Sequence, residues 1–151
     1  MEITINYWSI LLAAMDNLII NYWSVLIAAI ASFAIGGIWY GPLFGKKWMA
    51  LMGISKHDMK SMRLSPTQAM TLGFLFTLLQ SYVVVHVVAS LEVSGAGASW
   101  LLAFWVWLGI MVPITIGSFL WENKPFKLFV LNAAHQLISL FVMVLILASW
   151  F

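Results

Sequence analysis

The chain has 151 residues, of which 64% are apolar and 8% are charged, and its mean hydropathy is +1.01. This composition excludes a soluble globular domain, and the length leaves room for one membrane domain. The formal net charge of +2 comes from seven basic and five acidic side chains. We exclude a nucleic-acid partner, because the basic residues gather in two short segments between apolar runs. The absence of cysteine excludes disulfides, thiol catalysis and thiolate metal sites.

Four uncharged stretches are each long enough to cross a bilayer. A helix needs about 20 residues to span a hydrocarbon core of about 30 Å, and only helices or closed barrels satisfy the backbone there. The apolar residues are continuous rather than alternating, which favours helices. We therefore predict an all-α four-transmembrane-helix bundle, with helices at about 17–41, 66–91, 98–121 and 125–150.

The first 16 residues are predicted to form a segment separate from the transmembrane domain of 17–151. Residues 5–14 recur as residues 20–29 with eight identities in ten. The first copy is too short to span a membrane, so we predict a short N-terminal interfacial helix that arose by local duplication. The alternative is a helix that packs on a neighbouring protomer. No Lys or Arg precedes this apolar stretch, and we expect no cleaved signal peptide.

The predicted first span carries small residues at every fourth position, a pattern that lets helix backbones approach closely. These residues are Ser24, Ala28, Ser32 and Gly36. We expect Ala28, Ser32 and Gly36 to form a packing surface and to contribute to a homo-oligomer. Pro42 is expected to end this span, because proline disfavours helical geometry in the residue before it.

An amphipathic cytoplasmic loop is predicted between the first and second spans. Ser55 and Asp58 have the spacing of a helix cap. The methionines of this loop recur at spacings of three or four, which suits helices on the membrane surface with Lys and Arg toward anionic headgroups. The same methionines, with His57, could bind Cu(I), but methionine on an interfacial apolar face is commoner. We assign no metal site.

The charge distribution predicts the orientation. Lys and Arg are retained on the cytoplasmic side of a membrane, which places residues 42–66 and 122–127 there. The opposite side carries Glu2, Asp16 and Glu92, all acidic. We predict a multi-pass protein of the cell (inner or plasma) membrane, with both termini on the non-cytoplasmic side and the lipid bilayer as its surroundings.

One sequence pattern resembles a known family. The run from Trp39 to Met49 reads WYGPLFGKKWM, Tyr82 and His86 form a Tyr-x-x-x-His in the second span, and residues 127–132 read KLFVLN. Together they resemble the DUF1761 family of small membrane proteins with no established activity, from about residue 20 to the C-terminus. The resemblance implies a membrane fold and supplies no chemistry.

Polar side chains within the predicted spans are the candidate site. Four of them on the fourth span fall at i, i+3, i+4 and i+7, which places them on one helix face. Such a stripe must face protein or water rather than lipid. The second and third spans carry comparable stripes. The predicted ligand-binding residues are His135, Asn132, Gln136, Ser139, Gln80, Thr77 and Thr115.

Three functions fit this pattern. The working hypothesis is that a small amphiphilic molecule binds, or passes, at a polar cluster near the middle of the membrane. The first alternative is a membrane oxidoreductase in which His135 holds haem or contacts a quinone. The second is a structural or assembly partner whose polar stripes only join helices, each bond contributing about 0.6 kcal/mol. We assign no catalytic residue and no cofactor, and the enzyme question stays open with a preference for a non-enzymatic role.

Overall fold

The computed structural model describes residues 20–55, 58 and 63–150. Four helical spans in it are long and apolar enough to cross a membrane: Tyr22–Leu43, Pro66–Ser90, Gly95–Trp121 and Phe126–Ala148. No strand occurs in the described ranges. The prediction of an all-α protein with four membrane-spanning helices is therefore confirmed. The expected N-terminal interfacial helix falls in residues 1–19, outside the described part of the chain.

The spans are divided into the following elements. The first contains α2 (Tyr22–Ile38) and the π-helical segment η1 (Trp39–Leu43), and a short helix, α3 (Gly45–Met52), follows it. The second is a single helix, α4 (Pro66–Ser90). The third contains α5 (Gly95–Val106), the π-helical segment η3 (Trp107–Met111), α6 (Val112–Thr115) and α7 (Gly117–Trp121). The fourth is α8 (Phe126–Ala148).

Local capping fixes where the first two spans begin. The side chain of Asn21 accepts a hydrogen bond from the backbone N–H of Trp23, at 3.0 Å. Ser65 and Gln68 form a capping box, and Pro66 occupies the first turn of α4. Ser55 and Asp58 also exchange the expected reciprocal hydrogen bonds. The helix that these two residues were expected to begin lies mostly outside the described residues.

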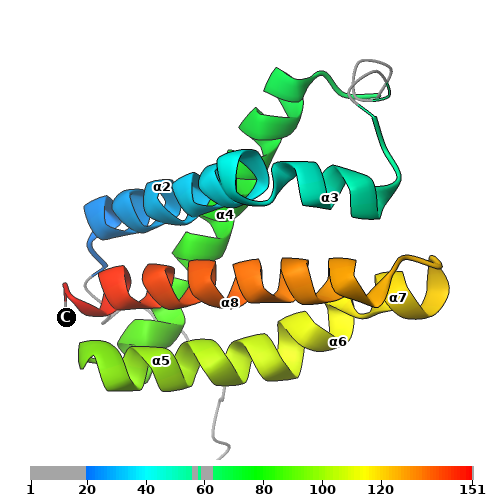
Figure 1. Ribbon diagram of the computed structural model, residues 1–151. Helices are drawn as coiled ribbons and strands as arrows, with labels where there is room; N and C mark the ends of the chain where they lie inside the picture. The colour runs from blue at the N-terminus through cyan, green and yellow to red at the C-terminus, as the bar shows by residue number, and fades with distance from the viewer. Residues whose placement is uncertain (1–19, 56–57, 59–62, 151) are drawn as a thin grey trace, which may run out of the picture.

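The helix α8 lies at the centre of the fold. It packs against α2 on one side and α5 on the other, and these three helices run side by side (Figure 1). A buried cluster fills the space between α2, α4, α5 and α8, and includes Val85, Val88, Leu140, Met143 and Leu147. These residues belong to the second half of α4 and the second half of α8, so the core lies toward the predicted outer side.

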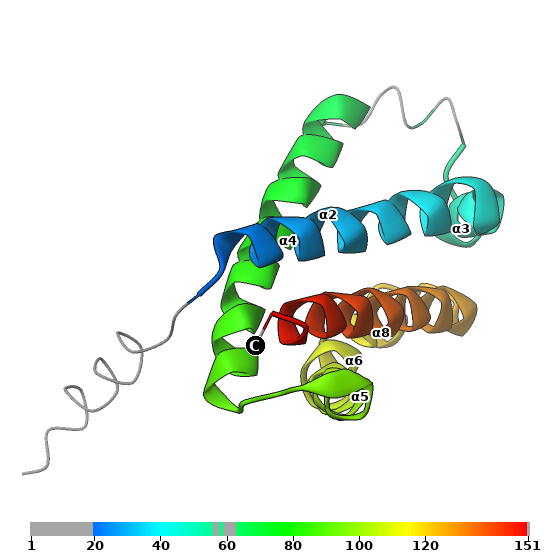
Figure 2. The same ribbon diagram turned by 90° about the vertical axis from the view of Figure 1, so that its left-hand side faces the viewer.

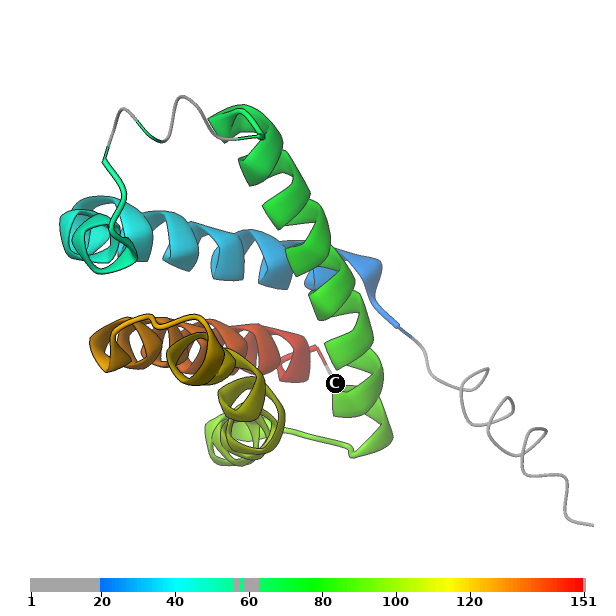
Figure 3. The ribbon, with the colours of Figure 1, turned by 90° about the vertical axis from the view of Figure 1, so that its right-hand side faces the viewer.

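The helix α4 departs from the regular bundle that the sequence suggested. It crosses the other helices obliquely, and its first half extends away from them (Figures 2 and 3). Residues 66–72 are all exposed, whereas Ser81, Val85, Val88 and Ala89 are buried. Only the second half of α4 therefore contributes to the core.

A glycine and a lysine hold α3 at the end of the first span. A Cβ atom at Gly45 would lie 2.5 Å from the carbonyl oxygen of Tyr40, so only glycine permits this close approach. Gly53 ends α3 in the left-handed region, with φ of 71°. Lys124, between α7 and α8, donates to the carbonyl of Met52 at 3.3 Å. The two segments predicted to be cytoplasmic thus meet at one end of the molecule.

Candidate functional site: a polar cluster on α8

Four polar side chains of α8 form the predicted stripe, and all four are partly buried: Asn132, His135, Gln136 and Ser139. The structure divides them between two neighbouring spans. Asn132, His135 and Ser139 contact the first span, whereas Gln136 contacts the third. The stripe therefore joins three helices instead of facing a single partner.

Hydrogen bonds connect the first span to α8 at two levels. The phenol of Tyr40 in η1 donates to Oδ1 of Asn132 at 3.0 Å. Nearer the C-terminal end of α8, the hydroxyl of Ser32 donates to the backbone carbonyl of Ser139, also at 3.0 Å. In a membrane such bonds contribute about 0.6 kcal/mol on average and reach about 1.7 kcal/mol.

The imidazole of His135 lies between these two connections. Its Nε2 atom is 3.1 Å from the hydroxyl of Ser139. A Cβ atom at Gly36 would lie 3.3 Å from the same nitrogen, so the imidazole packs directly on the α2 backbone. The rings of Tyr40 and Trp39 flank it, with centroids 4.8 Å and 6.0 Å away.

The third span contacts the same part of α8. Trp107 begins η3 and donates through Nε1 to the carbonyl of Ala133 at 2.8 Å. One turn beyond η3, the hydroxyl of Thr115 donates to Oε1 of Gln136 at 2.9 Å. Both π-helical segments thus supply an aromatic donor to residues 132–133 of α8. Single π-helical turns within α-helices occur frequently at functional sites.

One donor in this cluster lacks an acceptor. The Nε1 atom of Trp39 is buried and has no hydrogen-bond partner among the described residues. An unsatisfied buried donor costs about 1–3 kcal/mol, so native proteins rarely keep one without a reason. Trp39 also contacts Phe44, with ring centroids 4.7 Å apart, so its indole is held in place from two sides.

The sequence pattern that supplies these aromatic residues identifies the family. A family profile described as "Protein of unknown function (DUF1761)" matches residues 23–148, which is most of the chain. The chain belongs to the DUF1761 family. No curated protein and no solved structure matched it. The resemblance drawn from the sequence is confirmed, and its first motif, which begins at Trp39 and Tyr40, is the part of the first span that encloses His135.

Two predicted site residues of this DUF1761 structure, Gln80 and Thr77, lie on α4. Ser81, next to Gln80, donates to the carbonyl of Val25 at 2.8 Å. Val25 lies 11 residues from Gly36, which is about 16 Å along α2, so Gln80 is not brought to the His135 cluster. The hydroxyl of Thr77 donates within α4, to the carbonyl of Gly73 at 2.9 Å.

The small-residue surface of the first span is used within the chain. Ala28 and Ser32 are buried, and Gly36 contacts His135. This surface packs on α8 through Ser32 and Gly36 and is not available to a second copy. The expected packing role of these residues is therefore observed inside one chain, and their expected contribution to a homo-oligomer loses its support.

Sequence reasoning found the α8 stripe but missed its aromatic partners. Trp39 and Tyr40 were assigned to a family motif, and Trp107 was given no role, because nothing local shows which helix these side chains contact. The sequence did contain one indication of the π-helical segment η3: Pro113 cannot donate a backbone hydrogen bond and so perturbs the preceding helical turn.

Within the described ranges, no three His, Asp or Glu side chains converge as metal ligands.

Proposed function

We propose that this protein binds a small amphiphilic molecule at the cluster formed by Trp39, Tyr40, Asn132 and His135. The observation that carries the proposal is the buried indole N–H of Trp39, which lacks an acceptor beside three partly buried polar side chains. A carbonyl or hydroxyl oxygen of a ligand would accept this hydrogen bond. The remainder of the ligand would be apolar, since the cluster is surrounded by membrane-spanning helices.

Binding is favoured over passage in this conformation. Beyond Ser139, toward the predicted outer side, α8 is closed by Leu140, Met143, Val144 and Leu147, each at most 2% exposed. A molecule at His135 would therefore meet a packed core in that direction. Access to the cluster would come from the bilayer or from the end of the molecule that carries α3.

A structural role is the second candidate, and the interhelical bonds favour it. Tyr40 with Asn132, Thr115 with Gln136, and Ser32 with Ser139 already join α8 to its neighbours. The redox alternative has weaker support, because Nε2 of His135 faces Gly36 closely and leaves no room for a haem iron between them.

Thermal unfolding in detergent separates binding from structure. Oleyl alcohol carries a hydroxyl on an apolar chain, and octadecane is the control without oxygen. We expect oleyl alcohol alone to raise the Tm of the wild type, and we expect His135→Ala to abolish that rise. Thr71→Ala, which removes an exposed hydroxyl from α4 away from the cluster, is the control and should keep it. If oleyl alcohol and octadecane changed the Tm equally, and if the two alanine variants responded alike, the structural role would be favoured.

We also propose the topology with both termini on the non-cytoplasmic side. Lys46 and Lys47 on α3 lie at the same end of the molecule as Lys124, which contacts α3 directly. The α4–α5 turn at the opposite end carries Glu92. The distribution of basic residues supports a cytoplasmic location for the α3 end.

A homo-oligomer remains a prediction of the sequence. Because Ser32 and Gly36 pack on α8, we expect a second copy to contact a different part of the molecule. Mass measurement of the protein in several detergents and in nanodiscs tests it, and a strictly monomeric species in all of them would remove it.

A further inference from the structure

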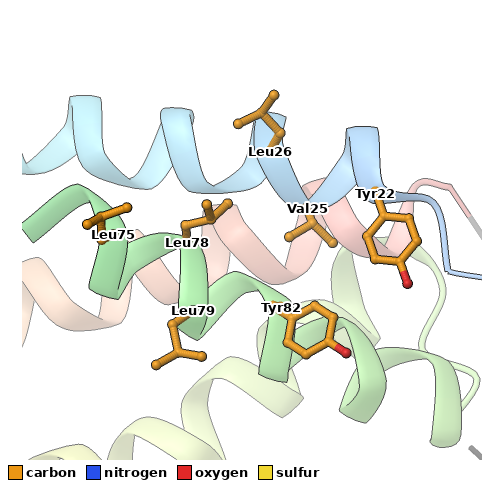
Figure 4. A pocket seen from close by; sticks show the side chains of 7 residues that line it. All are labelled: Tyr22, Val25, Leu26, Leu75, Leu78, Leu79 and Tyr82. Atoms are coloured by element: carbon orange, nitrogen blue, oxygen red, sulfur yellow. The ribbon is translucent and has the colours of Figure 1, made fainter.

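A hollow lies between α2 and α4, on the outer half of the molecule and away from the His135 cluster. It has a volume of about 480 Å³ and is lined by Tyr22, Val25 and Leu26 of α2 with Leu75, Leu79 and Tyr82 of α4. Figure 4 shows both tyrosine hydroxyls at the same end of this groove, and Leu75 at the other. The size is in the range of small-molecule sites, which is about 300–1,000 Å³.

We propose that this groove binds one acyl chain of a zwitterionic phospholipid from the outer leaflet. The groove extends from Leu75 to Tyr82, which is about 10 Å along α4 and shorter than the roughly 15 Å half-thickness of a hydrocarbon core. An acyl chain of one leaflet therefore suffices to fill it. The leucine side chains supply the apolar contacts, and helices in lipid associate with their neighbours through such packing.

The polar end of the groove matches a lipid headgroup. Tyr22 begins α2 at the predicted outer end, where tyrosine commonly occupies the membrane interface. The two tyrosine hydroxyls can donate to phosphate oxygens. The proposed lipid thus has its headgroup at the tyrosines and its acyl chain toward Leu75.

His86 extends the polar end beyond Tyr82. Its ring contacts that of Tyr82 at 4.7 Å, and its Nδ1 lies 2.7 Å from the Tyr82 carbonyl. Because a carbonyl only accepts, Nδ1 must donate, and Nε2 of the neutral ring is then an acceptor. An ethanolamine ammonium group is a suitable donor to it. The Tyr-x-x-x-His pattern of Tyr82 and His86 lies outside the His135 cluster, and in this proposal it contacts the lipid headgroup.

Charge at this end favours a zwitterionic over an anionic lipid. Among the described residues at the outer ends of the helices, Glu92 is the charged side chain, and no Lys or Arg lies there. An anionic headgroup would lack a cationic partner. A zwitterionic headgroup carries a cationic group, which is attracted to an acidic surface.

Photocrosslinking in native membranes identifies the occupant. Benzoylphenylalanine is placed at Leu79, which lines the groove, or at Phe76, which is 68% exposed on the same helix and outside the lining. We expect lipid adducts at both positions, and enrichment of phosphatidylethanolamine over anionic lipid at Leu79 alone. Adducts at Leu79 with a second copy or with residues 1–19 would overturn the proposal. So would identical lipid composition at the two positions.

Removal of the hydroxyls tests the headgroup contact without changing the apolar groove. Native mass spectrometry measures binding of added phosphatidylethanolamine and phosphatidylglycerol to the purified protein. We expect the wild type to bind phosphatidylethanolamine more tightly than phosphatidylglycerol. Loss of two hydrogen bonds to the phosphate, which both lipids carry, should weaken phosphatidylethanolamine binding of Tyr22→Phe/Tyr82→Phe by about tenfold or more and should also weaken any phosphatidylglycerol binding. Ser149→Ala, which removes an exposed hydroxyl at the end of α8, is the control. Equal binding of both lipids to wild type and double variant would overturn the proposal.

Discussion

The phenol of Tyr40 donates a hydrogen bond to Oδ1 of Asn132 at 3.0 Å, and it joins a π-helical turn of the first span to the central helix α8. The same tyrosine ring contacts the rings of His135 and Trp48, with centroids 4.8 Å and 5.7 Å away. Tyr40 therefore connects three elements: η1, α3 and α8. A substitution of this residue should therefore alter both the stability of the fold and the shape of the cluster.

Tyr40→Phe is expected to reduce stability modestly, since it removes one interhelical hydrogen bond and keeps the ring contacts. The expected loss is about 0.6 kcal/mol and at most about 1.7 kcal/mol. A double-mutant cycle with Asn132→Leu, measured by equilibrium unfolding in mixed micelles, isolates the pair. A coupling energy indistinguishable from zero would show that the bond contributes nothing.

Gly36→Leu is expected to destabilise the protein by about 1–3 kcal/mol, because the new side chain must displace His135. Gly37→Leu is the matched control, since a Cβ atom there has no neighbour within 4 Å. Both variants remove one glycine from the same helix, so the difference between them reports packing. Equal unfolding midpoints would contradict the close contact of α2 with His135.

The loop between the first and second spans supplies the pH prediction. Hydrogen bonds from Ser55 hold the pKa of the Asp58 carboxyl below its ordinary value. A lowered pKa means that the ionised carboxylate stabilises the loop at neutral pH, and that this contribution is lost as the pH falls through the lowered pKa. A carbon-13 NMR titration of Asp58 should show the depression, and Ser55→Ala should move the pKa back up. Ser65→Ala, at the other cap, should leave it unchanged.

The topology prediction is tested with reporters at Phe151 and Lys56. We expect the C-terminal reporter on the non-cytoplasmic side and the Lys56 reporter in the cytoplasm, because the basic residues gather at the α3 end. As a control, charge reversal at Lys46 and Lys47 should weaken this preference. A cytoplasmic C-terminal reporter together with a non-cytoplasmic Lys56 reporter in the wild type would contradict the proposed topology.

Much of the fold could be predicted because it depends on local signals. The caps at Asn21 and Ser65 need only the next two or three residues, and the apolar runs alone define the spans. The position of α4 was not predictable, because its continuous apolar sequence has no strongly polar face that would specify its neighbours. Lipid can cover its first half as well as protein can.

The candidate site was predictable only on α8. The spacing of Asn132 and His135 placed them on one face from helical geometry. Their partners Trp39 and Tyr40 lie more than 90 residues earlier, and the contact depends on Gly36 and on the extra residue of a π-helical turn. Conversely, Ser81, next to Gln80, contacts Val25 of α2, and the sequence does not reveal the angle at which α4 crosses α2.

The affinity of Trp39→Phe for an oxygen-bearing amphiphile tests the central proposal most directly. The variant keeps an aromatic ring but loses the buried indole N–H, and Trp105→Phe is the control because Trp105 is 64% exposed. Loss of one hydrogen bond should weaken oleyl alcohol binding by roughly two- to tenfold. Unchanged affinity of Trp39→Phe would contradict ligand binding at Trp39.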